Sequence, residues 1–197
     1  NKESNKQSDT SSSSSLVDTS QPKQFIQADF IDLSKVYTIS KFRSAQGHDF
    51  SGGGETCRSM KHYFYPQQDA TTDAMVKANN GIPPGPDGKT DIDIYSPVDG
   101  TLTQIQSERF PVGEQFYIVP DGAKDYTIRL FHVYKTDGIK QGMHVKAGQK
   151  LGVISKASAT DIAIETTQRR YVSYFSLMPD DIFAAYQARG ITSRDDL

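Results

Sequence analysis

Apolar and polar residues alternate along much of the second half of the chain, and this period of two predicts β-strands rather than helices. The pattern covers residues 92–96, 101–105, 115–119, 126–134 and 161–165. Turn residues separate the segments, as at Pro120–Asp121–Gly122. We therefore expect a mainly β, antiparallel domain whose strands bury one face.

The stretch from Gly138 to Glu165 is the most regular part of this pattern. Gly142, Gly148 and Gly152 fall among apolar residues that include Leu151 and Ile154. Glycine at such positions permits a positive φ and a close approach between strands. The stretch predicts tight hairpins within the β domain.

Earlier and later segments are less regular. We expect a helical turn around residues 32–34, strands at 36–42 and 60–65, and a turn-rich inserted loop over 67–90. Tyr171–Phe175 predicts a last strand. Residues 178–190 predict a C-terminal helix, with Pro and two aspartates at its start and Arg–Gly at its end.

Residues 1–23 are almost entirely polar and include serines at every position from 11 to 15. Such a segment buries too little surface to offset its ordering entropy, so we expect a disordered tether followed by one domain over 24–197. The chain begins at Asn1, which fits an exported protein with a processed signal segment and a lipid anchor upstream of Asn1. The end of an expressed fragment would look the same.

Composition and net charge limit the classes of partner that the chain is expected to bind. The hydrophobic fraction of 36% and the charged fraction of 23% are typical of a globular protein. Because the chain has 22 basic and 24 acidic residues, its net charge gives no sign of nucleic-acid binding. No apolar run is long enough for a transmembrane helix. Cys57 is the only cysteine, so no intrachain disulfide can form.

Three pieces occur in an order that resembles the lysostaphin-like (LytM-type) zinc endopeptidases. They are Gly47–Ser51, then Ser96–Thr101, then Phe131–Val133 with the glycine turns and Thr160–Glu165. The resemblance implies a duplicated hybrid motif fold (an antiparallel β-sandwich or barrel-sandwich hybrid), extracytoplasmic location, and peptidoglycan or a cell-wall protein as partner. Lipoyl and biotinyl carrier domains share the hybrid motif, but no lysine lies at a Met–Lys–Met type hairpin tip.

The resemblance also implies a zinc site that this chain does not keep intact. The family's His-x-Gly-x-Asp motif corresponds to residues 45–49, where Ala45 replaces the histidine and Asp49 keeps the aspartate. Its His-x-His motif corresponds to Asp161–Ile162–Ala163, so both histidines are replaced. His132 matches a further catalytic histidine. Catalytic zinc needs three protein ligands, so the ligand count argues against a working peptidase.

The remaining polar residues are nevertheless expected to meet in one cleft. The candidates are His132 and His48 as catalytic residues, Lys61, His62 and Tyr63 as binding residues, and Asp49, His132 and Asp161 as ligands of a non-standard metal site. A buried hydrogen-bond network is the alternative explanation.

Other residues have simpler interpretations. His144 is expected at the surface, and Cys57 is either a buried thiol or a nucleophile paired with a histidine. Tyr63, Tyr65, Tyr95 and Tyr117 either line a sugar- or peptide-binding groove or pack across strands. We expect an exported cell-envelope protein with a degenerate peptidase domain that binds or scaffolds. The second hypothesis is a metal-dependent hydrolase with a rebuilt site.

Overall fold

The computed structural model describes residues 17–20, 22–108 and 113–197. Within these ranges the chain forms ten strands and two α-helices, α1 (Ala70–Ala78) and α2 (Asp180–Gln187), which confirms the predicted mainly β fold with a C-terminal helix. The strands are β1 (Val36–Ile39), β2 (His62–Pro66), β3 (Ile92–Tyr95), β4 (Gly100–Ser107), β5 (Glu114–Pro120), β6 (Tyr126–Lys135), β7 (His144–Val145), β8 (Lys150–Ile154), β9 (Thr160–Thr166) and β10 (Tyr171–Val172). Short 3₁₀ helices span Leu33–Lys35, Tyr174–Leu177 and Arg194–Asp196.

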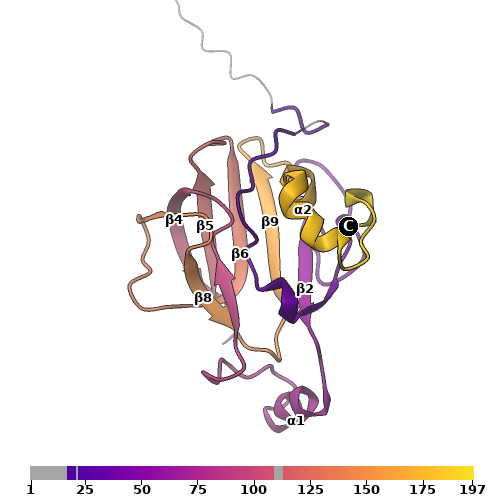
Figure 1. Ribbon diagram of the computed structural model, residues 1–197, viewed down its shortest axis with the longest axis vertical. Helices are drawn as coiled ribbons and strands as arrows, with labels where there is room; N and C mark the ends of the chain where they lie inside the picture. The colour runs from indigo at the N-terminus through magenta and orange to yellow at the C-terminus, as the bar shows by residue number, and fades with distance from the viewer. Residues whose placement is uncertain (1–16, 21, 109–112) are drawn as a thin grey trace, which may run out of the picture.

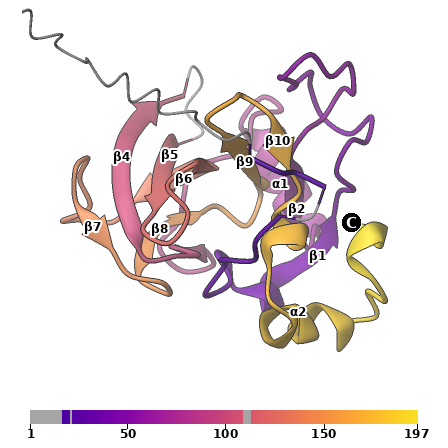
Figure 2. The same ribbon diagram turned by 90° about the horizontal axis from the view of Figure 1, so that it is seen from above.

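The strands form one antiparallel sheet in the order β1-β2-β9-β6-β5-β4-β7. A second ladder, β3 with β8, continues onto the end of β6, where Tyr134 pairs with Val153. Figures 1 and 2 show this ladder lying across one face of the main sheet. The ladder and the sheet thus make two layers with apolar side chains between them.

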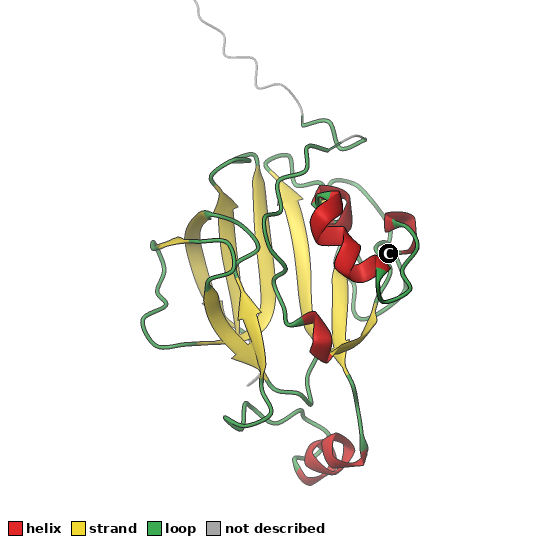
Figure 3. Ribbon diagram, viewed as in Figure 1, coloured by secondary structure: helices red, strands yellow, loops and turns green. Residues whose placement is uncertain are grey.

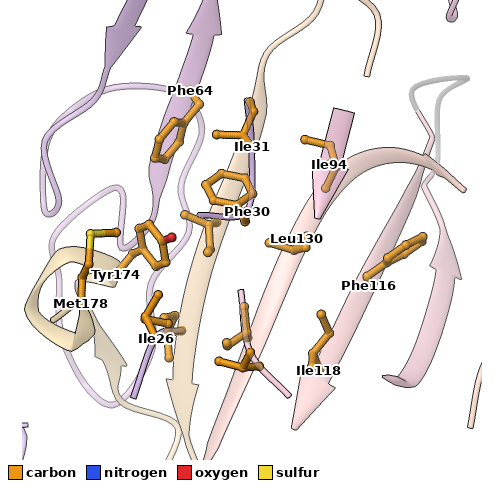
Figure 4. Close-up of a cluster of buried hydrophobic side chains, with 14 of the residues drawn as sticks. Ile26, Phe30, Ile31, Phe64, Ile94, Phe116, Ile118, Leu130, Tyr174 and Met178 are labelled. Atoms are coloured by element: carbon orange, nitrogen blue, oxygen red, sulfur yellow. The ribbon is translucent and has the colours of Figure 1, made fainter. Parts of the chain in front are cut away.

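The inner face of the sheet carries the apolar half of each alternating strand. Ile162 and Ile164 of β9 and Leu130 of β6 are completely buried there. Residues 25–31 run along this face, and Phe30 packs edge-on against Phe64 (Figure 4). Helix α2 covers the same face near β2 (Figure 3). The polar half of each strand is therefore left on the outer face.

The predicted glycine hairpins have a direct structural reason. Gly142 and Gly148 have φ of 86° and 74°, in the left-handed region that favours glycine. Gly152 lies so close to β6 that a Cβ atom would clash with the Tyr134 carbonyl oxygen. The second ladder thus joins the main sheet through a position that only glycine fits.

Two expected elements need correction, and a third expectation falls mostly outside the described residues. The segment 67–90 is not all loop, because Asp69 caps α1 through a reciprocal capping box with Thr72. The expected strand 171–175 pairs with β9 only at Tyr171 and Val172, and the chain then forms the 3₁₀ helix Tyr174–Leu177. Most of the proposed tether lies outside the described residues, although the half-buried Val17 packs against the core. No helix in the described ranges is long and apolar enough to cross a membrane.

Candidate functional site

Neighbouring strands bring a set of polar side chains together on the outer face of the sheet. Tyr63 of β2 pairs with Asp161 of β9, and Ala163 pairs with Arg129 of β6. The β2–β9 register, continued by one residue, places Lys61 opposite Ala163. Since residues two apart share a face, Lys61, Asp161 and Ala163 all lie on the side away from the core.

A β-bulge places His132 on this face as well. From Leu130 to Val133 strand β6 advances three residues while β5 advances only two, from Phe116 to Glu114. Leu130 and Val133 both stay in the core, so Phe131 and His132 are both released to the outer side. His132 has a φ of 63°, which is unusual for a residue with a side chain. The bulge aims the imidazole at Asp161.

Lys61 is the centre of the arrangement. Its side chain is 1% exposed, and its ammonium group donates to Asp161 Oδ2, which is fully buried. The same ammonium lies 3.3 Å from His48 Nε2. Because His48 Nδ1 lies 3.0 Å from the Asp49 carbonyl oxygen and donates to it, Nε2 is free to accept from Lys61. We call Lys61, Asp161, His48, His132 and Glu108 the Lys61 site.

Aromatic rings cover the ammonium group of Lys61. The Nζ atom lies 4.3 Å from the ring centre of Phe131, 4.7 Å from that of Tyr63 and 4.9 Å from that of Phe50. Phe50 is fixed there because its backbone bonds to Arg58 and Met60 at 2.7 and 2.8 Å. Cation–π attraction supplements the ion pair, and the rings exclude water from it. The Asp161 side chain beneath these rings has no exposed surface in the described structure.

His132 links the buried pair to a second carboxylate. Its Nδ1 bonds to Glu108, and its Nε2 lies 3.7 Å from Asp161 Oδ2. Burial would lower the pKa of His132, but the Glu108 hydrogen bond and the negative charge of Asp161 outweigh burial and raise it. Lys61 and His132 therefore both face the single carboxylate of Asp161. Its Oδ1 atom is buried and without a hydrogen-bond partner in the described ranges.

The residues at this place do not fit a zinc ion. The Lys61 ammonium has only donors, and it occupies the carboxylate that a metal would need. Ala163, beside it, offers no ligand. The residues that the structure describes contain no group of three His, Cys, Asp or Glu side chains able to hold a metal.

Two of the expected site residues lie elsewhere. The Asp49 side chain is 87% exposed and pairs with Arg58 at 3.1 Å, so the expectation that it joins Asp161 is wrong. His62 is buried on the core side, because it alternates with Lys61 and Tyr63 along β2. Its ring nitrogens bond to the Ser40 carbonyl at 3.0 Å and to the Ser173 hydroxyl at 2.9 Å. Its ring also packs edge-on against the core residue Phe175.

The other candidates lie outside the Lys61 site or pack beside it. His144 is exposed and pairs with Asp121 at 2.7 Å. Cys57 is half-buried beside a small apolar group that includes Phe42 and Met60. Tyr117 lies under the guanidinium of Arg129 at 4.9 Å, and Tyr63 stacks on Tyr65.

Sequence reasoning missed Glu108, Arg129 and Phe50 as parts of this face. Arg129 lies 5.1 Å from the rings of both Phe50 and Phe131 and bonds to Gln115 at 2.9 Å. The alternation of β6 was a signal for Arg129, because it places the residue on the polar face with Ala163. Nothing local marks Glu108 or Phe50, since each reaches the site from a loop or strand end distant in sequence.

Comparison with solved structures identifies the fold. The chain is similar to Helicobacter pylori Csd3, with a TM-score of 0.50 and 13% identity over 84% of this chain and 39% of that one. A zinc-containing peptidase from Vibrio cholerae matches with a TM-score of 0.48, at 15% identity over 80% of this chain and 41% of that one. The catalytic domain of the antimicrobial peptidase lysostaphin from Staphylococcus simulans matches with a TM-score of 0.42, at 12% identity over 68% of this chain and 86% of that domain.

The similarity to Csd3 supports the expected lysostaphin-like fold, and it shows the fold alone because the identity is low. The chain spans about two fifths of the length of Csd3. No family model and no curated protein sequence matches it.

Proposed function

We propose that this chain, which has the lysostaphin-like peptidase fold, is a non-hydrolytic domain that binds or scaffolds at the bacterial cell envelope. The observation that carries the proposal is the Lys61 ammonium on Asp161 beneath Phe50 and Phe131. Hydrolysis by this fold requires a metal that polarises the scissile carbonyl and activates water. A buried lysine performs neither step.

Envelope location and the partner are part of the same proposal. Solved structures of this fold include the catalytic domain of an antimicrobial peptidase, and the serine-rich start of the chain suits a flexible spacer. Peptidoglycan or a cell-wall protein is the partner we expect, on an exported and lipid-tethered protein. Sedimentation of the chain with protein-free sacculi supports peptidoglycan. Failure to sediment, together with capture on sacculi that retain their proteins, supports a protein partner.

Metal analysis tests the absence of hydrolysis. The full chain, purified without chelator, is assayed for zinc and then incubated with purified peptidoglycan and added zinc. We expect substoichiometric zinc and no new amino termini. Stoichiometric zinc with chelator-sensitive release of amino termini would overturn the proposal.

A designed variant provides the positive control for metal binding. Lys61→Asp with Ala163→His removes the ammonium and puts two ligand side chains beside Asp161, because Lys61 lies opposite Ala163. We expect the double variant to bind zinc at least tenfold more tightly than the wild-type chain. Equal zinc affinity for the two proteins contradicts the role given to Lys61.

A further inference from the structure

A second concave site lies at the free edge of the sheet, beside β1. It has a volume of about 350 Å³ and lies between the 3₁₀ helix Leu33–Lys35, β1, the loop before β3 and the end of α2. This volume is within the range of small-molecule sites.

Among the described residues, the lining of this site is basic and contains no carboxylate. Lys35, Lys89, Lys156 and Arg189 all contribute, and no Asp or Glu does. The chain as a whole has more acidic than basic residues, 24 against 22. Four cations from four separate segments therefore concentrate positive potential at one place. We call it the basic pocket.

Three of these four cations lack an ion pair in the described structure. Lys35, Lys89 and Arg189 form no ion pair with any described residue, and only Lys156 has a partner, Asp69 at 3.7 Å. Like charges gathered without counter-charge repel one another, and an anion bound among them relieves the repulsion. The pocket is thus electrostatically complementary to a ligand with more than one negative charge.

One of the cations is held in place by the fold. The Arg189 guanidinium donates to the Leu33 carbonyl and, at 2.7 Å, to the Val36 carbonyl. These bonds fix its position at the end of α2 before any ligand arrives, which reduces the entropy lost on binding. Arg189 also connects the pocket to β1, whose edge carries Tyr37 at 74% exposure.

The floor of the pocket is apolar. Val36, Pro66 and Ile92 are buried beneath the charged rim. The ring of Tyr37 and the hydroxyl groups of Ser34 and Thr90 complete the lining. Apolar walls with a few charged groups are the usual composition of a site for an organic anion rather than for a bare ion.

We propose that the basic pocket binds a small phosphate ester, with the phosphate among the cations and an apolar or ring portion against Val36, Pro66 and Tyr37. Lysine and arginine both bind phosphate, lysine as a point charge and arginine through paired N–H donors. The site is distinct from the Lys61 site and does not depend on its chemistry.

Phenyl phosphate is the probe, because it joins a dianion to one ring. Binding to the full chain is followed by NMR at constant ionic strength, with phenol and inorganic phosphate as partial ligands. We expect saturable shifts at residues 34–37 and 89–92, at least tenfold weaker binding of inorganic phosphate, and no saturation by phenol. Absence of saturable shifts at these residues would overturn the proposal.

Charge variants separate a site from general attraction. Lys35→Gln with Lys89→Gln removes two exposed charges of the pocket, and Lys77→Gln with Lys140→Gln removes two exposed charges elsewhere. We expect the first pair to weaken phenyl phosphate at least tenfold and the second to change it less than twofold. Equal weakening by both pairs would reduce the pocket to non-specific surface charge. Neither result bears on zinc content or peptidoglycan hydrolysis, which are the readouts for the Lys61 site. Failure of this proposal can therefore be told apart from failure of the proposed function.

Discussion

Replacing Lys61 with methionine removes the ammonium while keeping a long side chain against Phe50, Tyr63 and Phe131. Asp161 then loses its ammonium partner and keeps only His132, at 3.7 Å, beside a buried carboxylate whose Oδ1 atom already has no partner in the described ranges. Removal of one member of a buried ion pair costs about 3–5 kcal/mol. For a chain of this size, each 1 kcal/mol lowers Tm by about 2–4 °C, so we expect a loss of about 6–20 °C.

Urea unfolding of a double-mutant cycle tests the cause of this loss. Lys61→Met with Asp161→Leu removes both charges, and we expect most of the stability to return, because an apolar pair needs no counter-charge. The control is Lys146→Met, which breaks an ion pair with Asp99 whose lysine is 69% exposed and should cost less than about 1 kcal/mol. If Lys61→Met alone costs no more than this control, or if the double variant is as unstable as the single one, the reasoning fails.

Two further predictions concern titrating groups. Burial lowers the pKa of His62 from 6.5 to about 4, so its contribution to stability is full above 6.5 and falls by about 3 kcal/mol as pH drops to 4. Burial raises the pKa of Asp29 from 3.8 to about 6, so its contribution is full below 3.8 and is lost as pH rises through 6. The two effects oppose each other in one pH window. The His62→Gln variant should therefore gain stability on acidification from pH 6 to 4. Urea unfolding at each pH measures the free energy of unfolding, and the same dependence of this free energy on pH in the variant as in the wild-type chain would refute the prediction. Glu108→Gln should lower the pKa of His132 in an NMR titration, whereas Glu114→Gln, which loses only a bond to Lys135, should not. Equal shifts in both variants would show that Glu108 has no specific role.

The fold could be predicted from the sequence because its rules are local. Period-two alternation is a property of each strand, and Gly152 reports a close approach that no other residue permits. The same rule correctly places Asp161 and Ala163 on one face. Helix α1 was missed because its cap, Asp69 with Thr72, lies in a segment with few apolar residues.

The composition of the site was harder to predict because it depends on packing between distant segments. Lys61 and Asp161 are one hundred residues apart and meet only through the β2–β9 register. Phe50 reaches them from a loop, and the bulge at His132 shifts the alternation of β6 by one residue. Asp49 was matched by motif spacing, which does not determine the direction of a loop side chain.

The Lys61–Asp161 pair also affects which sequence changes the chain tolerates. Either residue changed alone strands a buried charge, whereas both changed together need not. The two positions are therefore epistatic, because the effect of a substitution at one of them depends on the residue at the other. Selection for stability therefore keeps Lys61 and Asp161 together, since a change at either position alone is penalised and only a paired change is tolerated.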